Sequence, residues 1–248
     1  MIVLKNSSEL ALMRIAGRIS AQALQVGGEM VRPGVTTGQI NQKIHEFILS
    51  QDAIPSFLGY GGFPASACIS INDTVIHGIP GDEVIQEGDI VSIDVGALYK
   101  GFHGDNAATF PAGRISPEAQ QLLDATRESL YKGIEAAVSG NRVGDISAAI
   151  ERSIKPYGYG IVRKFVGHGV GREMHESPEV PNYGLPGRGP RLAVGMTIAI
   201  EPMINLGSHD VKILSDGWTV KTVDKSLSAH FEHTVAITDD GPVILTKP

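Results

Sequence analysis

Three acidic residues stand inside segments that are otherwise apolar and strand-like, and this pattern constrains the chain more than any other. Asp94 lies within residues 90–95, Glu201 within residues 197–204 and Glu232 within residues 229–237. A buried carboxylate without a partner is costly, so it either takes up a proton or pairs with a cation. None of the three segments contains Lys or Arg. A divalent metal ion is therefore the partner that the pattern favours.

Each of these acids, taken singly, also fits simpler interpretations. It could be a core carboxylate that accepts hydrogen bonds from backbone amides, or an edge-strand residue that faces water. A fourth acid, Asp105, follows a glycine-containing turn, and alone it is typical of a turn residue. We expect residues 90–98 and a second strand ending at Phe110 to form a hairpin, which would bring Asp105 back beside Asp94.

Histidines add a second kind of ligand. His168 lies in the segment Gly-His-Gly-Val-Gly, His175 follows seven residues later, and His77 precedes Gly-Ile-Pro. A lone histidine is commonly an ordinary surface or core residue, but the glycines beside His168 allow another backbone to approach closely. Four carboxylates with imidazole and no thiolate are typical of a catalytic metal site, in contrast to the cysteine ligands of structural zinc sites.

The charge of these acids suggests how many ions they hold. Four carboxylates carry four negative charges, which two divalent ions would neutralise. Such two-metal sites activate water and polarise a carbonyl or phosphoryl group. The sequence therefore predicts hydrolysis of an amide or ester, or phosphate chemistry. Motifs for other kinds of catalytic site are weak. The segment at His175, for example, is interrupted by Pro178 and lacks the second histidine of a His-Glu-x-x-His helix.

Helix signals and apolar periodicity predict one α+β domain over residues 1–248. Asn6 with Glu9, and Thr36 with Gln39, mark the starts of helices that reach residues 30 and 51. Ser116 before Pro117 opens a long helix, and a shorter one follows Gly144. Besides the hairpin, strands are expected at residues 67–71, 196–206, 212–214, 218–223, 229–238 and 243–246. Residues 181–190 are expected to form a surface loop.

Composition narrows the setting in which such a domain works. The chain has 248 residues, of which 42% are apolar, and its net charge is 21 − 27 = −6. This mildly acidic balance gives no basic footprint for nucleic acid or an anionic membrane. Cys68 is the single cysteine, so no intrachain disulfide can form. No apolar run approaches the ~20 residues of a membrane helix. We expect a soluble, cytoplasmic protein.

With these residues in view, the chain resembles a type I methionine aminopeptidase over essentially its whole length. The resemblance is carried by residues 68–72 with 77–80, Asp94 with 101–105, 167–171, 200–202 and 231–234. It implies the pita-bread fold, in which helices flank a central antiparallel sheet and two halves are related by a pseudo-twofold axis. The same ligand pattern occurs in proline-directed peptidases of that fold.

The resemblance also implies roles for individual residues. Two divalent ions (Co, Mn, Fe or Zn), with room for a monovalent cation nearby, would be bound by Asp94, Asp105, His168, Glu201 and Glu232. His77 would contact the scissile amide and His175 would stabilise the oxyanion. Glu201 would also act as general base. Together with both histidines, the substrate pocket would comprise Tyr60, Phe63, Cys68, Met174 and Trp218.

The implied activity is removal of the N-terminal methionine from nascent proteins and peptides whose second residue is small. The resemblance suggests a monomer that acts near the ribosome exit. An X-Pro peptidase of the same fold is the alternative within the class. A non-catalytic peptide-binding module is the alternative outside it, although such a module would be expected to lack ligands that are all present here.

Overall fold

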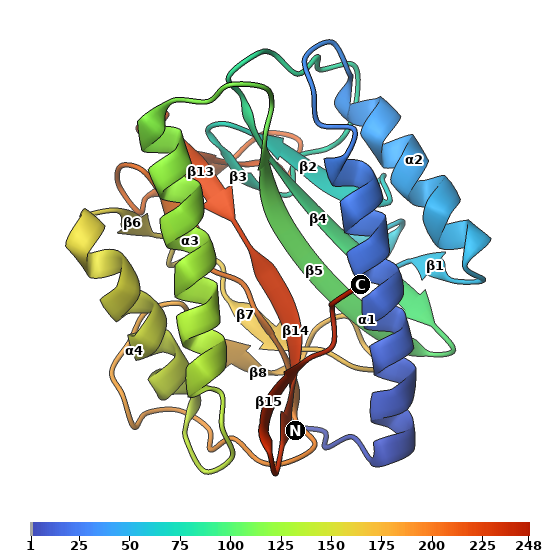
Figure 1. Ribbon diagram of the computed structural model, residues 1–248, viewed down its shortest axis with the longest axis vertical. Coiled ribbons are helices and arrows are strands. Elements are labelled where there is room, and N and C mark those ends of the chain that lie inside the picture. Colours follow the sequence, from blue (N-terminus) through green and yellow to red (C-terminus); the bar gives the residue numbers. More distant parts are fainter. Residues whose placement is uncertain (1) are drawn as a thin grey trace.

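The computed structural model describes residues 2–248, and within that range four α-helices cover a large curved sheet (Figure 1). The helices are α1 (Ser7–Gly28), α2 (Thr37–Ser50), α3 (Pro117–Ala136) and α4 (Val143–Ile154). Short 3-10 turns occur at η1 (Tyr60–Gly62) and η2 (Lys155–Tyr157). Helices α1, α2 and α3 start where their capping signals predict, because each of these starts supplies a side-chain acceptor for a free backbone N–H group of the first turn.

The capping contacts are explicit at three helices. The side chain of Asn6 accepts from the backbone N–H of Glu9, and that of Thr36 accepts from Gln39. Both form complete capping boxes. The hydroxyl of Ser116 accepts from the N–H of Ala119 at 3.1 Å, just before the proline that opens α3.

The main sheet contains nine of the strands found within residues 2–248. They are β1 (Ile54–Pro55), β2 (Ala67–Ile71), β4 (Ile90–Tyr99), β5 (Phe102–Pro111), β7 (Gly167–Gly169), β8 (Glu176–Val180), β9 (Thr197–Ile200), β14 (Glu232–Thr238) and β15 (Gly241–Ile244). Its central order is β1-β4-β5-β14-β9-β7-β8, and every pairing is antiparallel. The predicted hairpin is confirmed, since Tyr99 pairs with Phe102 across the β4–β5 turn.

Two three-stranded sheets flank the main one. The first contains β6 (Gly160–Ile161), β10 (Met203–Asn205) and β13 (Ser228–His230). The second contains β3 (Thr74–Ile76), β11 (Val211–Ile213) and β12 (Val220–Thr222).

The apolar core is divided between two helix pairs. One cluster packs α1 and α2 against β2 and β4, through residues such as Ile44 and Ile93. The other packs α3 and α4 against β9 and β14, through residues such as Leu130, Ile198 and Val235. This arrangement is the α+β architecture of two flanked halves that the sequence predicts.

Two predicted strands are wrong as continuous elements. Residues 196–206 form β9 and β10, which are separated at Glu201 and Pro202, and residues 229–238 form β13 and β14, which are separated at Phe231. The interruptions face each other, because the N–H of Phe231 donates to the carbonyl of Pro202 at 3.3 Å. Apolar periodicity does not reveal where a strand passes from one sheet to another. The ends of the strands predicted at 218–223 and 243–246 also differ, since β12 is shorter and β15 begins two residues earlier.

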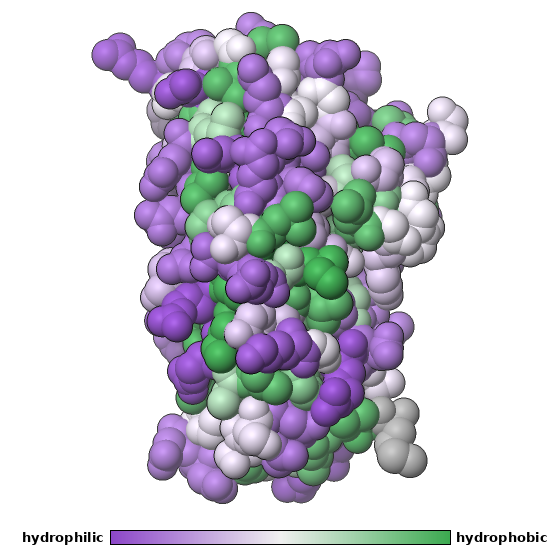
Figure 2. All heavy atoms as spheres, turned by 90° about the vertical axis from the view of Figure 1, so that its right-hand side faces the viewer, coloured by the Kyte–Doolittle hydropathy of each residue, from purple (hydrophilic) through white to green (hydrophobic). Residues whose placement is uncertain are grey.

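The surface beside α1, α2 and β1 is mixed, with hydrophobic side chains scattered among polar ones (Figure 2). Leu49 and Ile54 are among the exposed apolar residues of the chain. Across residues 2–248, none of the helices combines the length and apolarity needed to cross a membrane. The strongly polar faces of the helices are those turned away from the two cores.

The Ser116 cap gives a direct test of this interpretation of α3. Replacing Ser116 with Ala removes the acceptor for the Ala119 N–H and should lower the free energy of unfolding by about 1 kcal/mol. Ser116→Asp keeps an acceptor and places a negative charge at the helix N-terminus, so it should retain wild-type stability. Urea unfolding followed by circular dichroism measures both variants, and equal losses in the two would contradict the capping role.

Candidate metal centre and active site

A cavity of about 300 Å³ opens beside the main sheet, and the twelve residues singled out from the sequence all line it. They are Tyr60, Phe63, Cys68, His77, Asp94, Asp105, His168, Met174, His175, Glu201, Trp218 and Glu232. These residues span more than 170 positions of the chain, so their convergence is a property of the fold and not of any local motif.

Asp94 and Asp105 reach the cavity from the β4–β5 hairpin. Asp94 pairs with Ala107 and Asp105 pairs with Gly96, so the two acids are diagonal neighbours on one face of the hairpin. Successive strand residues point to opposite faces. Ile93 and Val95 pack into the α1–α2 core, and Asp94 between them therefore points away from the helices.

Glu201 and Glu232 enter from the bend where β9 and β14 leave the main sheet. Glu201 follows the last residue of β9, and Glu232 is the first residue of β14. The register places Ile200 opposite His233, so the two carboxylates lie at the same level of adjacent strands. Pro202 has no N–H to donate to a strand partner, which suits a point where pairing is interrupted.

His168 is held in β7 with one ring nitrogen free. Its Nδ1 hydrogen bonds with the carbonyl of Gly169 at 2.8 Å, which assigns the proton to Nδ1 and leaves the Nε2 lone pair open. Nε2 lies 3.6 Å from Asp105 Oδ2 and 3.5 Å from Glu201 Oε1. Its flanking glycines are needed for packing, because a Cβ at Gly167 would lie 2.3 Å from the carbonyl of Ala199.

The carboxylates are crowded into a poorly solvated space, and their proton affinities respond. Burial raises the pKa of Asp94 to about 7. Burial, and then the charges of Asp94 and Glu201, raise the pKa of Asp105 well above its ordinary value. Glu201 and Glu232 also have strongly raised pKa values, first because of burial and then because of neighbouring acids. Burial lowers the pKa of His168 to about 3, so its ring is neutral.

This donor set fits divalent metal ions. Asp94 Oδ1 and Glu232 Oε1 are buried and have no hydrogen-bond partner. Ligand atoms of Asp105, His168 and Glu232 lie within 4.8 Å of one another. In the described residues 2–248, no Lys or Arg forms an ion pair with any of the four acids. Unpaired buried carboxylates with one neutral imidazole are what Mn, Fe, Co and Zn ions accept as ligands.

Two further histidines approach the cavity from other segments. His77 has a φ of 58°, a conformation that non-glycine residues seldom adopt, and its ring meets Phe165 and Trp218 edge-on. Burial and the nearby His175 lower the pKa of His77 to about 4, so its ring is neutral. His175 Nδ1 shares a 2.7 Å hydrogen bond with the Tyr60 hydroxyl, and its ring lies 4.1 Å from that of His168.

The remaining wall of the cavity is apolar. Phe57, Phe63, Cys68 and Met174 are buried in one cluster, and Trp218 packs on its rim. The rings of Phe63 and Trp218 meet edge-on at 5.2 Å. Burial raises the pKa of the Cys68 thiol well above its ordinary value, so this cysteine contributes packing and is a poor nucleophile.

Sequence reasoning missed several residues that line the same cavity. Phe57 and Ile76 precede segments that were recognised, and Lys164, Phe165 and Val166 lead directly into the glycine-flanked His168. Their proximity in sequence to recognised segments was the available signal. His230 also approaches the carboxylates, since its Nε2 lies 3.8 Å from Glu201 Oε2 without a hydrogen-bond partner.

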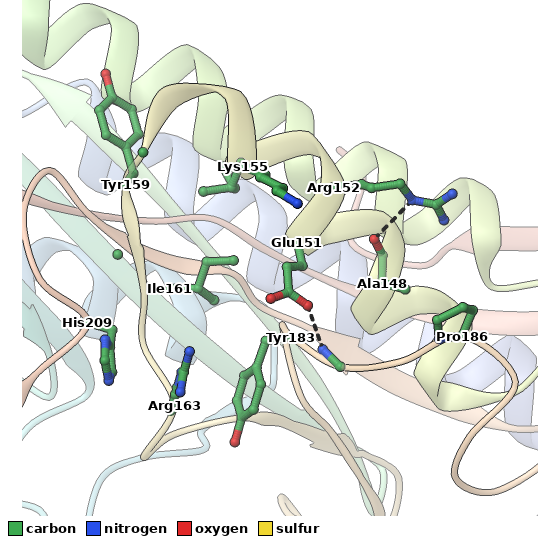
Figure 3. A pocket seen from close by; sticks show the side chains of 14 residues that line it. Ala148, Glu151, Arg152, Lys155, Tyr159, Ile161, Arg163, Tyr183, Pro186 and His209 are labelled. Carbon is green, nitrogen blue, oxygen red and sulfur yellow. Dashed lines mark hydrogen bonds between the residues drawn. The ribbon is translucent and has the colours of Figure 1, made fainter.

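A larger cleft of about 650 Å³ lies elsewhere, beside α4 and β6. Figure 3 shows that its charged groups do not converge on one point. Glu151 accepts from the N–H of Gly184, and Arg152 donates to a carbonyl of its own helix. Arg163 stacks on Tyr183. The smaller cavity, with its concentrated carboxylates, therefore has the chemistry of an active site.

Comparison with known proteins agrees with this geometry. Residues 11–239 match the model of metallopeptidase family M24. The chain belongs to family M24. Methionine aminopeptidase from Clostridium acetobutylicum is 55% identical over 99% of both chains, and methionine aminopeptidase 1 from Bacillus subtilis is 50% identical over 100% of both. These relatives confirm the resemblance to methionine aminopeptidases that the sequence motifs of this M24 peptidase indicate.

Solved structures extend the comparison to the fold. The crystal structure of methionine aminopeptidase from Thermotoga maritima superimposes with a TM-score of 0.98, at 44% identity over 100% of both chains. Prolidase from Pyrococcus furiosus has a TM-score of 0.78 at 25% identity, over 99% of this chain and 66% of that one. The pita-bread fold predicted for this M24 peptidase is confirmed.

The raised pKa values predict that metal binding releases protons. A carboxyl group whose pKa is raised remains partly protonated near neutral pH, and an arriving cation must displace that proton. Mn²⁺ binding to metal-free protein should therefore release more protons at about pH 6.5 than at about pH 8.5, where the acids are already more ionised. Calorimetry in buffers of different ionisation enthalpy measures the release. Equal proton release at both pH values would contradict the raised pKa values.

Proposed function

We propose that the cavity removes the N-terminal methionine of a peptide by attack of water on the first peptide bond. The observation that carries this proposal is the meeting of four buried carboxylates and an imidazole with an apolar pocket in one cavity of about 300 Å³. Family membership establishes the class, a metal-dependent aminopeptidase.

The metal ligands in this proposal are Asp94, Asp105, His168, Glu201 and Glu232. Support comes from their burial, their orphaned oxygens and the close approach of His168 to two of the acids. Their charge suits two divalent ions better than one, because a single ion would leave two negative charges unneutralised. Bound at this position, divalent ions supply Lewis-acid activation of water and of the substrate carbonyl.

The chain's own groups perform the proton transfers and position the peptide. Glu201, whose carboxylate lies beside His168 in the cavity, accepts the proton of the attacking water as general base. His77 contacts the scissile amide from its position between Phe165 and Trp218. The Tyr60 hydroxyl, whose pKa is raised mainly by burial, donates to His175 Nδ1, which leaves an Nε2–H to stabilise the oxyanion.

The apolar wall selects the side chain of the first residue. Phe63, Cys68 and Met174 are almost fully buried and surround a space suited to a flexible thioether side chain. Trp218 and Tyr60 lie at the more exposed rim. Because the cavity is small, we propose that it accepts a small second residue and excludes a larger one.

All twelve residues come from a single chain, so a monomer contains everything that the proposal needs. The substrates in this proposal are nascent chains as they leave the ribosome, since these present a free N-terminal methionine. Likeness to the prolidase fold keeps an X-Pro peptidase as the second candidate. That candidate is less well supported, because full-length identity to methionine aminopeptidases is twice as high.

A peptide panel tests the proposed specificity. Protein loaded with Mn²⁺ or Co²⁺ should cleave Met-Ala-Ser and leave Ala-Pro-Ser intact, as measured by chromatography of the products. The reverse preference would establish the X-Pro alternative. Glu201→Ala removes a ligand and the proposed base, so metal content and turnover should both fall; unchanged metal occupancy would reject Glu201 as a ligand.

The pocket assignment has its own test. Trp218→Ala removes aromatic surface from the rim of the methionine pocket, and should lower kcat/KM for Met-Ala-Ser about tenfold, mainly through KM. Tyr157→Ala removes an exposed aromatic ring that does not line the cavity and should leave kcat/KM unchanged. Similar losses in both variants would argue against a substrate contact by Trp218.

A further inference from the structure

The loop between β7 and β8 carries two residues of the proposed site, Met174 and His175, and one carboxylate holds this loop closed. Glu176, the first residue of β8, directs Oε1 back into the loop. That oxygen accepts from the backbone N–H of Arg172 at 2.9 Å and of Glu173 at 3.3 Å. The conformation of the segment just before His175 therefore depends on the orientation of the Glu176 side chain.

The second oxygen of Glu176 is held by a residue from the opposite end of the sequence. Oε2 forms an ion pair with Nζ of Lys5, and the two side chains are only 2% (Lys5) and 9% (Glu176) exposed. Lys5 is fixed in turn, because its N–H donates to the carbonyl of Gly195 at 2.7 Å and Nζ also donates to the carbonyl of Val3 at 3.3 Å. A buried lysine is rare without such a partner.

The glycine-rich segment around His168 makes room for this pair. A Cβ at Gly171 would lie 2.4 Å from Lys5 Cε and 2.5 Å from Glu176 Oε1. The last glycine of Gly-His-Gly-Val-Gly, Gly171, is therefore explained by the space that the Lys5–Glu176 pair needs. Metal binding by His168 does not explain a glycine at this position. Figure 1 shows the N-terminal segment crossing the lower edge of the molecule before α1 begins.

A second, outer ion pair links the same loop to α1. Arg172 donates to Glu9 at 3.1 Å and its guanidinium stacks on the ring of Phe102. The Arg172 side chain is 62% exposed, so the contribution of this pair is small in water. It provides a matched comparison, because both pairs join the loop to the N-terminal region but only the Lys5–Glu176 pair is buried.

We infer that Lys5 and Glu176 are positioning residues that set His175 and Met174 for the reaction, an inference that rests on the proposed function of those two side chains. Neither Lys5 nor Glu176 lines the cavity. They act through the 171–175 loop. Glu176 binds the backbone of this loop, and Lys5 determines the orientation of the Glu176 carboxylate. The N-terminal segment is thus part of the active-site framework.

Lys5→Met tests the inference, because it removes the charge while keeping an unbranched side chain. The amides of residues 171–175 should exchange with deuterium at least tenfold faster, while those of α3 and β14 keep their wild-type rates. The kcat for Met-Ala-Ser should fall at least tenfold. Glu176→Gln, which keeps the shape and one acceptor, should give a smaller change of the same kind. Glu9→Gln breaks the outer pair and should change exchange and kcat less than twofold.

A double variant separates positioning from stability. Lys5→Met combined with Glu176→Met replaces the buried pair by apolar side chains, which should recover the melting temperature lost in Lys5→Met. The acceptor for Arg172 and Glu173 is absent, so fast loop exchange and low kcat should persist. Recovery of kcat together with the melting temperature would overturn the inference, as would unchanged loop exchange in Lys5→Met. Exchange needs no substrate, so it decides the question even if wild-type protein leaves Met-Ala-Ser intact.

Discussion

The repulsion among four carboxylates in a poorly hydrated cavity is the interaction on which this structure depends. Asp94, Asp105, Glu201 and Glu232 have raised pKa values because burial and their mutual proximity both disfavour ionisation. The four acids stay this close only because the backbone that carries them is rigid. The long β4–β5 hairpin and the paired bend after β9 supply this rigid backbone. Cations bound among the acids turn the net electrostatic repulsion into attraction.

The bend illustrates how a local interruption of a sheet serves chemistry. If β9 continued into β10 without a break, residues 200–202 would alternate strictly between the two faces of one sheet. Instead Glu201 and Glu232 stand where both strands turn together, and Phe231 donates to Pro202 across the turn. The interruption leaves Glu201 and Glu232 at the end of the regular ladder, beside the cavity that both side chains line.

Local signals predicted much of this structure. Capping boxes at Asn6 and Thr36, and the proline after Ser116, fixed helix starts because they concern groups a few residues apart. The β4–β5 hairpin followed from one turn between two apolar runs. The breaks within two strands were missed. The alternation of apolar residues continues unchanged where a strand leaves one sheet and pairs in another, so the sequence pattern does not mark the break.

In the candidate site, too, some features could be predicted from the sequence and others could not. Acids in apolar strands indicated a metal site because burying them alone is unfavourable, whereas the pocket residues and the roles of His77 and His175 rested on resemblance. The ion pair between Lys5 and Glu176 could not be foreseen, since 171 positions separate its partners. Nothing local distinguishes Lys5 from an ordinary solvent-exposed lysine.

The division of the proposed ligands between the two halves has a consequence for how the centre forms. Asp94 and Asp105 belong to the hairpin beneath α1 and α2, whereas Glu232 begins β14, a strand that packs with α3 and α4 through Val235. Both halves therefore have to fold and dock before the proposed centre exists. A molecule in which only one half has folded would present an incomplete set of carboxylates.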